Sequence, residues 1–228
     1  MGLTIYYKLS VEKELTVAGV RELAARVARY AQKIGCAETG PVERVTADTP
    51  FTSLCVRTGR EEDCCFGLVP AKRGWVVEVW PGEGCESATM GLCQYLRRIP
   101  FRAGSVSTGF AGGWLLKGAC KTQYAAEHGW EHFLLCHQRV VSVLEFWGEL
   151  GVTVEVSDEG GYWQTRDEQK LRSVLTAYDG LMAAVAGQVK DAADDSGEGQ
   201  AIASPIFARK DFERLEAAGR WELARHLP

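Results

Sequence analysis

The chain has 228 residues, of which 46% are hydrophobic and 25% are charged, a composition typical of a globular domain with a buried core. Its formal charge of -4 gives no electrostatic attraction to nucleic acid or to an anionic membrane, so we expect neither as a partner. No apolar run reaches the roughly 20 residues that span a bilayer. The first residues lack the pattern of a secretory signal, and we expect a cytoplasmic location.

Eight cysteines lie between residues 36 and 136. A chain of this size can bury enough apolar surface to fold without cross-links, and nothing in the sequence marks it for secretion. No two cysteines have the C-x-x-C spacing of a redox motif or a zinc ribbon. We therefore expect free thiols, most of them buried.

The N-terminal third of the sequence changes from a strand pattern to a helix pattern and back. Apolar residues at every second position predict a strand over residues 3–9. One apolar stripe predicts a helix over residues 17–34, with Thr16 as its cap and Gly35 as its stop. Short β-rich runs separated by turns predict an antiparallel meander over residues 41–80.

Two segments in the middle of the chain do not follow a single pattern. Residues 85–98 carry apolar side chains at helical spacing, although Gly91 and the flanking prolines weaken a helix there. Residues 100–113 are rich in glycine and serine, which is typical either of a strand with irregular ends or of a mobile loop.

A strand–helix–strand unit follows, with polar residues at its joints. Residues 114–118 and 152–156 have strand composition, and residues 129–149 carry an apolar helical stripe. If the two strands run parallel in one sheet, the turns after Cys120 and Asp158 lie at the same edge of that sheet. A further helix is predicted over residues 167–189.

These patterns predict an α+β fold: a mostly antiparallel sheet with two or three long amphipathic helices on one face, plus a C-terminal arm. We expect residues 1–190 to form a single domain, with two similar strand–helix–strand halves as an alternative. Residues 191–200 are acidic and nearly free of large apolar groups, which predicts a flexible linker. Residues 201–228 are expected to form an arm that docks on the domain. The helical stripes allow a homodimer but do not require one.

The first candidate site is the polar run that follows residues 114–118. A cysteine beside a lysine can have a lowered pKa, and with a histidine nearby it can act as a nucleophile. Loops after strands are also where binding residues collect. A polar edge strand with a solvated lysine is the plainer interpretation. The catalytic candidates of this run are Cys120 and Lys121, and its binding candidates are Gln123 and Tyr124.

His137 lies on the apolar line of the helix predicted over residues 129–149, together with Phe133 and Leu144, so its side chain should point inward. A buried imidazole needs hydrogen-bond partners, because an unpaired ring nitrogen costs about 1–3 kcal/mol. We favour a core histidine bonded to a backbone carbonyl or a buried carboxylate. A general base that faces a cleft is the alternative.

The turn after residues 152–156 is acidic. Asp158 and Glu159 could act as acid and base or ligate a hard cation, and Tyr162 and Trp163 are binding candidates beside them. The sequence Asp-Glu-Gly-Gly is also what a tight turn favours, because glycine supplies positive φ. We favour the turn.

His128, His132 and Cys136 recur every four residues on one helix. Imidazole and thiolate ligands suit zinc, but the spacing is not that of the H-E-x-x-H motif. We therefore predict no metal and no other cofactor, with zinc or another divalent cation as the less favoured alternative.

The sequence contains no phosphate-binding loop, dinucleotide-binding motif or nucleophile elbow. We therefore expect a cytosolic domain that binds a protein or a small ligand. The alternative is a hydrolase or transferase, with a polar cleft formed by the turns at 120–124 and 155–163 together with His137.

Overall fold

A computed structural model describes residues 3–12, 14–46, 48–49, 51–57, 66–101, 104–196, 205–208 and 210–226. The chain divides into two compact units, one from Thr4 to Glu159 and the other from Gly160 onward, which also takes in Leu3. The division therefore falls at the acidic turn, about thirty residues before the end of the single domain expected from the sequence.

The first unit is built on an antiparallel sheet. Seven of the described strands join it, in the order β11-β1-β10-β7-β6-β2, with β3 also paired to β6. The sheet strands are β1 (Thr4–Val11), β2 (Glu38–Thr39), β3 (Glu43–Arg44), β6 (Arg73–Trp80), β7 (Ala88–Gln94), β10 (Trp114–Lys121) and β11 (Thr153–Asp158).

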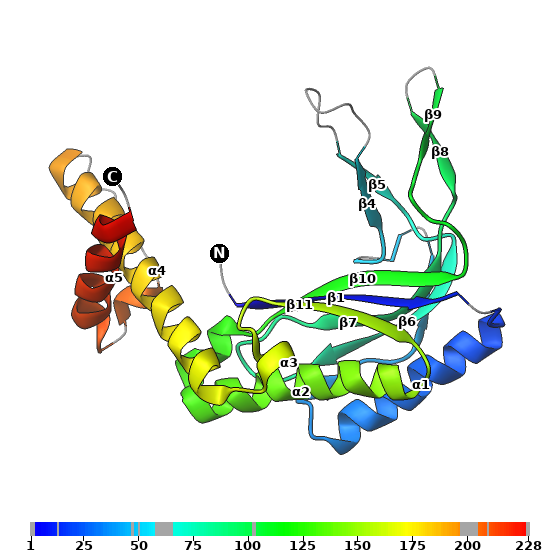
Figure 1. The fold of residues 1–228 in the computed structure, drawn as a ribbon, viewed down its shortest axis with the longest axis horizontal. Coiled ribbons are helices and arrows are strands. Elements are labelled where there is room, and N and C mark those ends of the chain that lie inside the picture. Colours follow the sequence, from blue (N-terminus) through cyan, green and yellow to red (C-terminus); the bar gives the residue numbers. More distant parts are fainter. Residues whose placement is uncertain are drawn as a thin grey trace. The chain divides into compact units, whose positions relative to one another are not determined.

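One face of this sheet is covered by two helices, α1 (Val17–Lys33) and α2 (Trp130–Glu149) (Figure 1). Two hairpins stand on the other side, β4 (Leu54–Arg57) with β5 (Phe66–Val69), and β8 (Arg98–Phe101) with β9 (Gly104–Ser107). A short 3-10 helix, η1 (Gln123–His128), links β10 to α2. This arrangement confirms the α+β fold with long helices on one face of a mostly antiparallel sheet.

The helices α1 and α2 form where the amphipathic pattern of the sequence predicted them. The Thr16 side chain accepts a hydrogen bond from the Gly19 amide at 3.0 Å and caps α1, and Gly35 follows the helix end with a φ of 79°. The buried side chains of α2 include Phe133, His137 and Leu144, which is the line that the spacing predicted.

The ambiguous segment at 85–98 is a strand and not a helix. In β7 every residue from Ala88 to Cys93 is buried, so the period-two signal of a half-buried strand is missing. Gly91 suits this strand because a Cβ there would collide with the carbonyl oxygen of Trp75 on β6. The glycine-rich stretch that follows forms the hairpin of β8 and β9.

The second unit is helical and contains α3 (Tyr162–Thr165), α4 (Glu168–Ser196), the 3-10 helix η2 (Pro205–Ala208) and α5 (Phe212–His226). The linker predicted at 191–200 is wrong over its first six residues, which continue α4. The guanidinium of Arg220 on α5 pairs with Asp191 at 2.5 Å and with Glu216 at 2.6 Å. The pair with Asp191 ties this last part of α4 to α5. The predicted C-terminal arm therefore packs on α4. Residues 197–200 lie outside the described residues.

In the part of the chain that the structure describes, no helix is long and apolar enough to cross a bilayer.

Candidate functional site

The joints of the strand–helix–strand unit meet at one edge of the sheet, as the sequence predicted. β10 and β11 both pair antiparallel with β1, so they run parallel to each other. Their registers place Cys120 and Asp158 on either side of Ile5. The polar residues after the two strands consequently lie close together in space.

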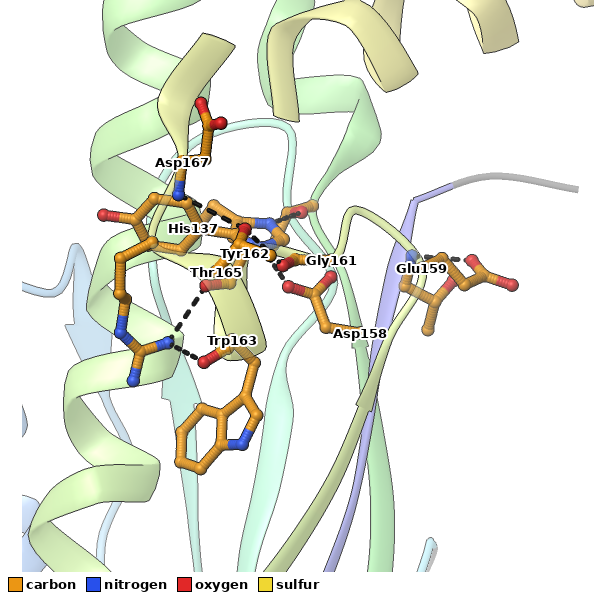
Figure 2. Close-up of polar contacts among 11 residues, drawn as sticks. His137, Asp158, Glu159, Gly161, Tyr162, Trp163, Thr165 and Asp167 are labelled. Atoms are coloured by element: carbon orange, nitrogen blue, oxygen red, sulfur yellow. Dashed lines mark hydrogen bonds and ion pairs between the residues drawn. The ribbon is translucent and has the colours of Figure 1, made fainter. Parts of the chain in front are cut away.

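His137 of α2 bridges these two joints. Its Nε2 lies 3.2 Å from Asp158 Oδ2, and its Nδ1 lies 3.0 Å from Thr122 Oγ1. Figure 2 shows the ring of His137 and the carboxylate of Asp158 facing each other. Both side chains have no exposed surface. Since the carboxylate accepts from Nε2–H, a neutral ring leaves Nδ1 to accept from the Thr122 hydroxyl. We call Thr122, His137 and Asp158 the buried relay.

The order of groups in the buried relay is hydroxyl, imidazole, carboxylate, which is also the order in a nucleophile–base–acid triad. A triad has to expose its nucleophile to a substrate, whereas Thr122 has no exposed surface. The same contacts have a structural role, because they join the ends of β10 and β11 to α2 with every ring nitrogen partnered. The burial favours this structural role over chemistry.

The other candidates of the 120–124 turn do not share one environment. Cys120 is fully buried, its Sγ donates to the Glu86 carbonyl at 3.3 Å, and burial raises the pKa of its thiol, which weighs against a nucleophile. Lys121 Nζ lies 3.1 Å from the Tyr124 hydroxyl and 4.6 Å from the centre of its ring. Gln123 is buried, and Tyr124 is 49% exposed.

The candidates of the acidic turn are engaged in contacts of their own. Glu159 Oε2 accepts a hydrogen bond from the Thr4 amide at 2.9 Å, so this carboxylate closes the end of the β1–β11 ladder. Tyr162 and Trp163 belong to α3 in the second unit (Figure 2). The guanidinium carbon of Arg166 lies 5.8 Å and 4.9 Å from the centres of their rings.

The histidine ladder is used in local contacts. His132 Nε2 lies 2.9 Å from the Glu83 carbonyl oxygen and 3.5 Å from Cys136 Sγ, and His128 Nε2 lies 3.9 Å from Glu83 Oε1. Among the described residues, no three or more histidine, cysteine, aspartate or glutamate side chains are arranged to hold a metal ion. The six described cysteines are free thiols.

A groove that we did not predict from the sequence lies on the sheet face without helices. Ile5 and Tyr7 of β1 are buried, so the alternate residue Tyr6 points to the other face and is 48% exposed. The groove has a volume of about 760 Å³, within the usual range for small-ligand sites. Its lining includes Tyr6, Phe51, Trp80, Cys85, Glu86 and Lys117.

Phe51 is held in an unusual way at this groove. Its φ is 58°, a left-handed conformation that costs a residue with a bulky side chain roughly 1–3 kcal/mol. Its side chain is nevertheless 74% exposed. The backbone is therefore strained while the aromatic ring stays in solvent, a combination that core packing does not explain.

A smaller hollow of about 330 Å³ adjoins the groove and shares Trp80 and Thr89 with it. Glu38, Glu43 and Glu78 line this hollow. These three carboxylates form no ion pair with any residue that the structure describes. Carboxylates without a counter-charge attract a cation. We call the groove and this hollow together the open-face groove.

The second unit has a hollow of its own, with a volume of about 890 Å³ along α4 and α5. Small and apolar residues such as Gly180, Leu181 and Leu223 make up most of its lining, and Arg172 is charged. Its lining also has three uncharged polar side chains, but no aromatic residue among those described. We take the open-face groove as the better candidate site because aromatic rings and charged groups meet there.

Sequence reasoning could have found only part of this geometry. Thr122 follows Cys120 at the strand period of two, which was a usable signal that both side chains point inward. The groove is lined by residues from distant segments, among them Phe51, Trp80 and Lys117. Trp80 and Lys117 are brought together by the order of strands in the sheet, and Phe51 comes from the segment before β4. No local pattern in the sequence reports that pairing.

Comparisons of this chain with protein-family models, with curated proteins and with solved structures gave no match.

Proposed function

We propose that this protein binds a small organic cation with an apolar body in the open-face groove. The observation that carries the proposal is the place of Trp80, which is common to both hollows. Trp80 lines the groove together with two further aromatic residues, Tyr6 and Phe51, and it lines the smaller hollow together with the three glutamates. Aromatic faces attract an alkylammonium group, and carboxylates attract it at longer range.

The charges around the open-face groove support a cation over an anion. Glu86 and the three glutamates of the smaller hollow outnumber Lys117, the lysine in the lining. The neighbouring Lys8 is already neutralised by Glu155 at 2.7 Å, and Lys121 lies over the Tyr124 ring. Lys117 at one end and the carboxylates at the other would orient the bound cation toward Trp80.

The test compares two probes of the same size and opposite charge, benzyltrimethylammonium and benzenesulfonate, by isothermal titration. We expect the cation to bind more tightly and Trp80→Ala to weaken it about tenfold, since a desolvated cation–π contact contributes about 1–2 kcal/mol. Lys117→Gln should strengthen cation binding slightly, because it removes a repulsive charge. Arg29→Gln, which removes a positive charge from α1 on the helix-covered face, is the control and should leave binding unchanged. Tighter binding of the sulfonate would refute the proposal.

A second candidate function, hydrolysis or group transfer, is favoured by the triad-like order of the buried relay. It would need Thr122 to become accessible together with His137 and Asp158. Thr122→Val tests it, since the variant keeps the shape of the side chain and removes the hydroxyl. Hydrolysis of a panel of activated esters by the unaltered chain, with loss of that activity in Thr122→Val, would favour an enzyme over a binding protein.

A further inference from the structure

Two cysteine side chains, Cys136 and Cys85, meet where α2 faces the turn between β6 and β7. Cys136 of α2 faces the turn that joins β6 to β7, and Cys85 lies in that turn. Arg139, one turn farther along α2, donates from Nη1 to the Pro81 carbonyl oxygen at 2.8 Å. This hydrogen bond ties the helix to the start of the turn.

The turn is closely fitted to the sulfur of Cys136. The Cys85 amide donates to the Gly82 carbonyl oxygen at 3.2 Å and closes the turn. A Cβ at Gly82 would collide with Cys136 Sγ, so only glycine fits beneath the sulfur. The side chain of Cys85 also acts directly on the Cys136 thiol, whose pKa it lowers. The two sulfurs are therefore neighbours although they are far apart in the sequence.

The surroundings make the two thiols chemically unequal. The hydrogen bond from Cys85 lowers the pKa of Cys136 to about 7 against the opposing effect of burial, and His132 and Arg139 lower it further. His132 Nε2 lies 3.5 Å from the Cys136 sulfur. The pKa of Cys85 is raised because it donates the hydrogen bond to Cys136 and is partly buried. The direction of these shifts favours the Cys136 sulfur as the nucleophile of the pair.

We propose that Cys136 and Cys85 are a peroxide-oxidised thiol pair that closes to a reversible disulfide. The turn that brings Cys85 to Cys136, the glycine beneath the Cys136 sulfur and the histidine beside it carry this inference. Cys136 is fully buried, but Cys85 is partly exposed and lines the open-face groove, from which a molecule as small as hydrogen peroxide can approach. The proposal goes beyond ligand binding and does not depend on it.

The chemistry balances with a hydroperoxide as the oxidant. The Cys136 thiolate attacks one peroxide oxygen, the O–O bond breaks, and the leaving hydroxide takes a proton to become water, which leaves a sulfenic acid on Cys136. The Cys85 sulfur then attacks that sulfur and gives up its proton. The sulfenic oxygen leaves with this proton and its own as a second water. Two thiols are oxidised by two electrons and the peroxide is reduced by two.

The test treats the full chain with hydrogen peroxide and maps its thiols by mass spectrometry. We expect two of the eight cysteines to be lost as thiols and to return with dithiothreitol. Cys85 and Cys93 lie on one tryptic peptide, so a second cleavage after Glu86 is needed to assign the bridge. A bridge from Cys136 to Cys36, or no loss of thiols in the folded chain, would overturn the proposal.

Two variants separate the two steps of the reaction. In Cys85→Ser, Cys136 should stop at the sulfenic acid, which dimedone traps once the peroxide-treated chain is unfolded in urea, whereas Cys136→Ser should give neither the adduct nor the bridge. Cys93→Ser is the matched control, since Cys93 is another buried thiol, and it should leave the bridge intact. Dimedone labelling of Cys85 in the Cys136→Ser chain would contradict the assigned roles. If a variant fails to fold, the map of the unaltered chain still decides the pairing.

Discussion

The buried relay and the open-face groove lie on the same sheet and differ in how their polar groups are satisfied. In the relay, His137 has a hydrogen-bond partner at each ring nitrogen, and its side chain has no exposed surface. In the groove, Phe51 is exposed in a strained conformation, and three glutamates share a hollow without a described counter-charge. The relay contains the residue types of catalysis, yet the groove has the unmet interactions that a ligand would satisfy.

This difference teaches that residue type alone is a poor guide to a functional site. A buried histidine with satisfied partners stabilises the fold, because each partner would otherwise be left unpaired in the interior. The strained backbone of Phe51 lowers the stability of the free protein, and a bound cation would offset that cost. The comparison can be tested by changing each region and measuring stability and binding separately.

The largest effect is expected in the relay. His137→Ala leaves the Asp158 carboxylate and the Thr122 hydroxyl without the imidazole and opens a cavity, so we expect about 3–5 kcal/mol less unfolding free energy. Urea denaturation followed by circular dichroism measures this. Lys121→Ala, at the same joint, is the control and should change stability by less than about 0.5 kcal/mol. A loss of under about 1 kcal/mol in His137→Ala would contradict a structural relay.

A smaller loss is expected where α2 meets the turn before β7. Gly82→Ala pushes a methyl group against Cys136 Sγ, which should cost about 1–3 kcal/mol through overpacking. Gly104→Ala is the matched control, because a Cβ there would meet nothing within 4 Å. Thermal unfolding of the two variants side by side measures the difference. Equal melting temperatures would mean that the turn is not fitted to the sulfur.

In the open-face groove, a substitution is expected to raise the unfolding free energy rather than to lower it. Phe51→Gly relieves a positive φ and should raise the unfolding free energy by about 1 kcal/mol. The same change removes an aromatic wall, so the affinity for benzyltrimethylammonium should fall about three- to tenfold. A variant that is less stable than the original chain would show that the Phe51 ring serves packing.

The last effect is the pH dependence of stability that the thiol pair contributes. The pKa of Cys136 is lowered from 9.0 to about 7 in the folded chain, so between these pH values the unfolded chain binds more protons and stability rises with pH. Above pH 9 the sign reverses, because Cys85, Cys93 and Cys120 have raised pKa values and keep protons that the unfolded chain loses. Urea midpoints across this range measure the curve, and Cys136→Ser should remove its rising part.

The sequence predicted the relay better than the groove for physical reasons. Helical periodicity predicted that His137 points inward, and the strand–helix–strand order predicted that Asp158 lies at the same edge of the sheet as Cys120. Both predictions rest on elements that follow one another along the chain. The segment at 85–98 was ambiguous because β7 is buried throughout and shows no alternation. The open-face groove depends on which strands pair and on the backbone angle of Phe51, and neither is encoded by spacing along the chain.

The most direct test of the account is a nuclear magnetic resonance titration of the isotope-labelled chain with benzyltrimethylammonium. We predict that the largest shifts fall on the Trp80 indole and on the amides of Tyr6, Phe51 and Glu78, and that benzenesulfonate at the same concentration shifts them less. Shifts concentrated instead on the lining of the α4–α5 hollow, such as Leu181 and Leu223, would contradict the claim that the open-face groove is the binding site.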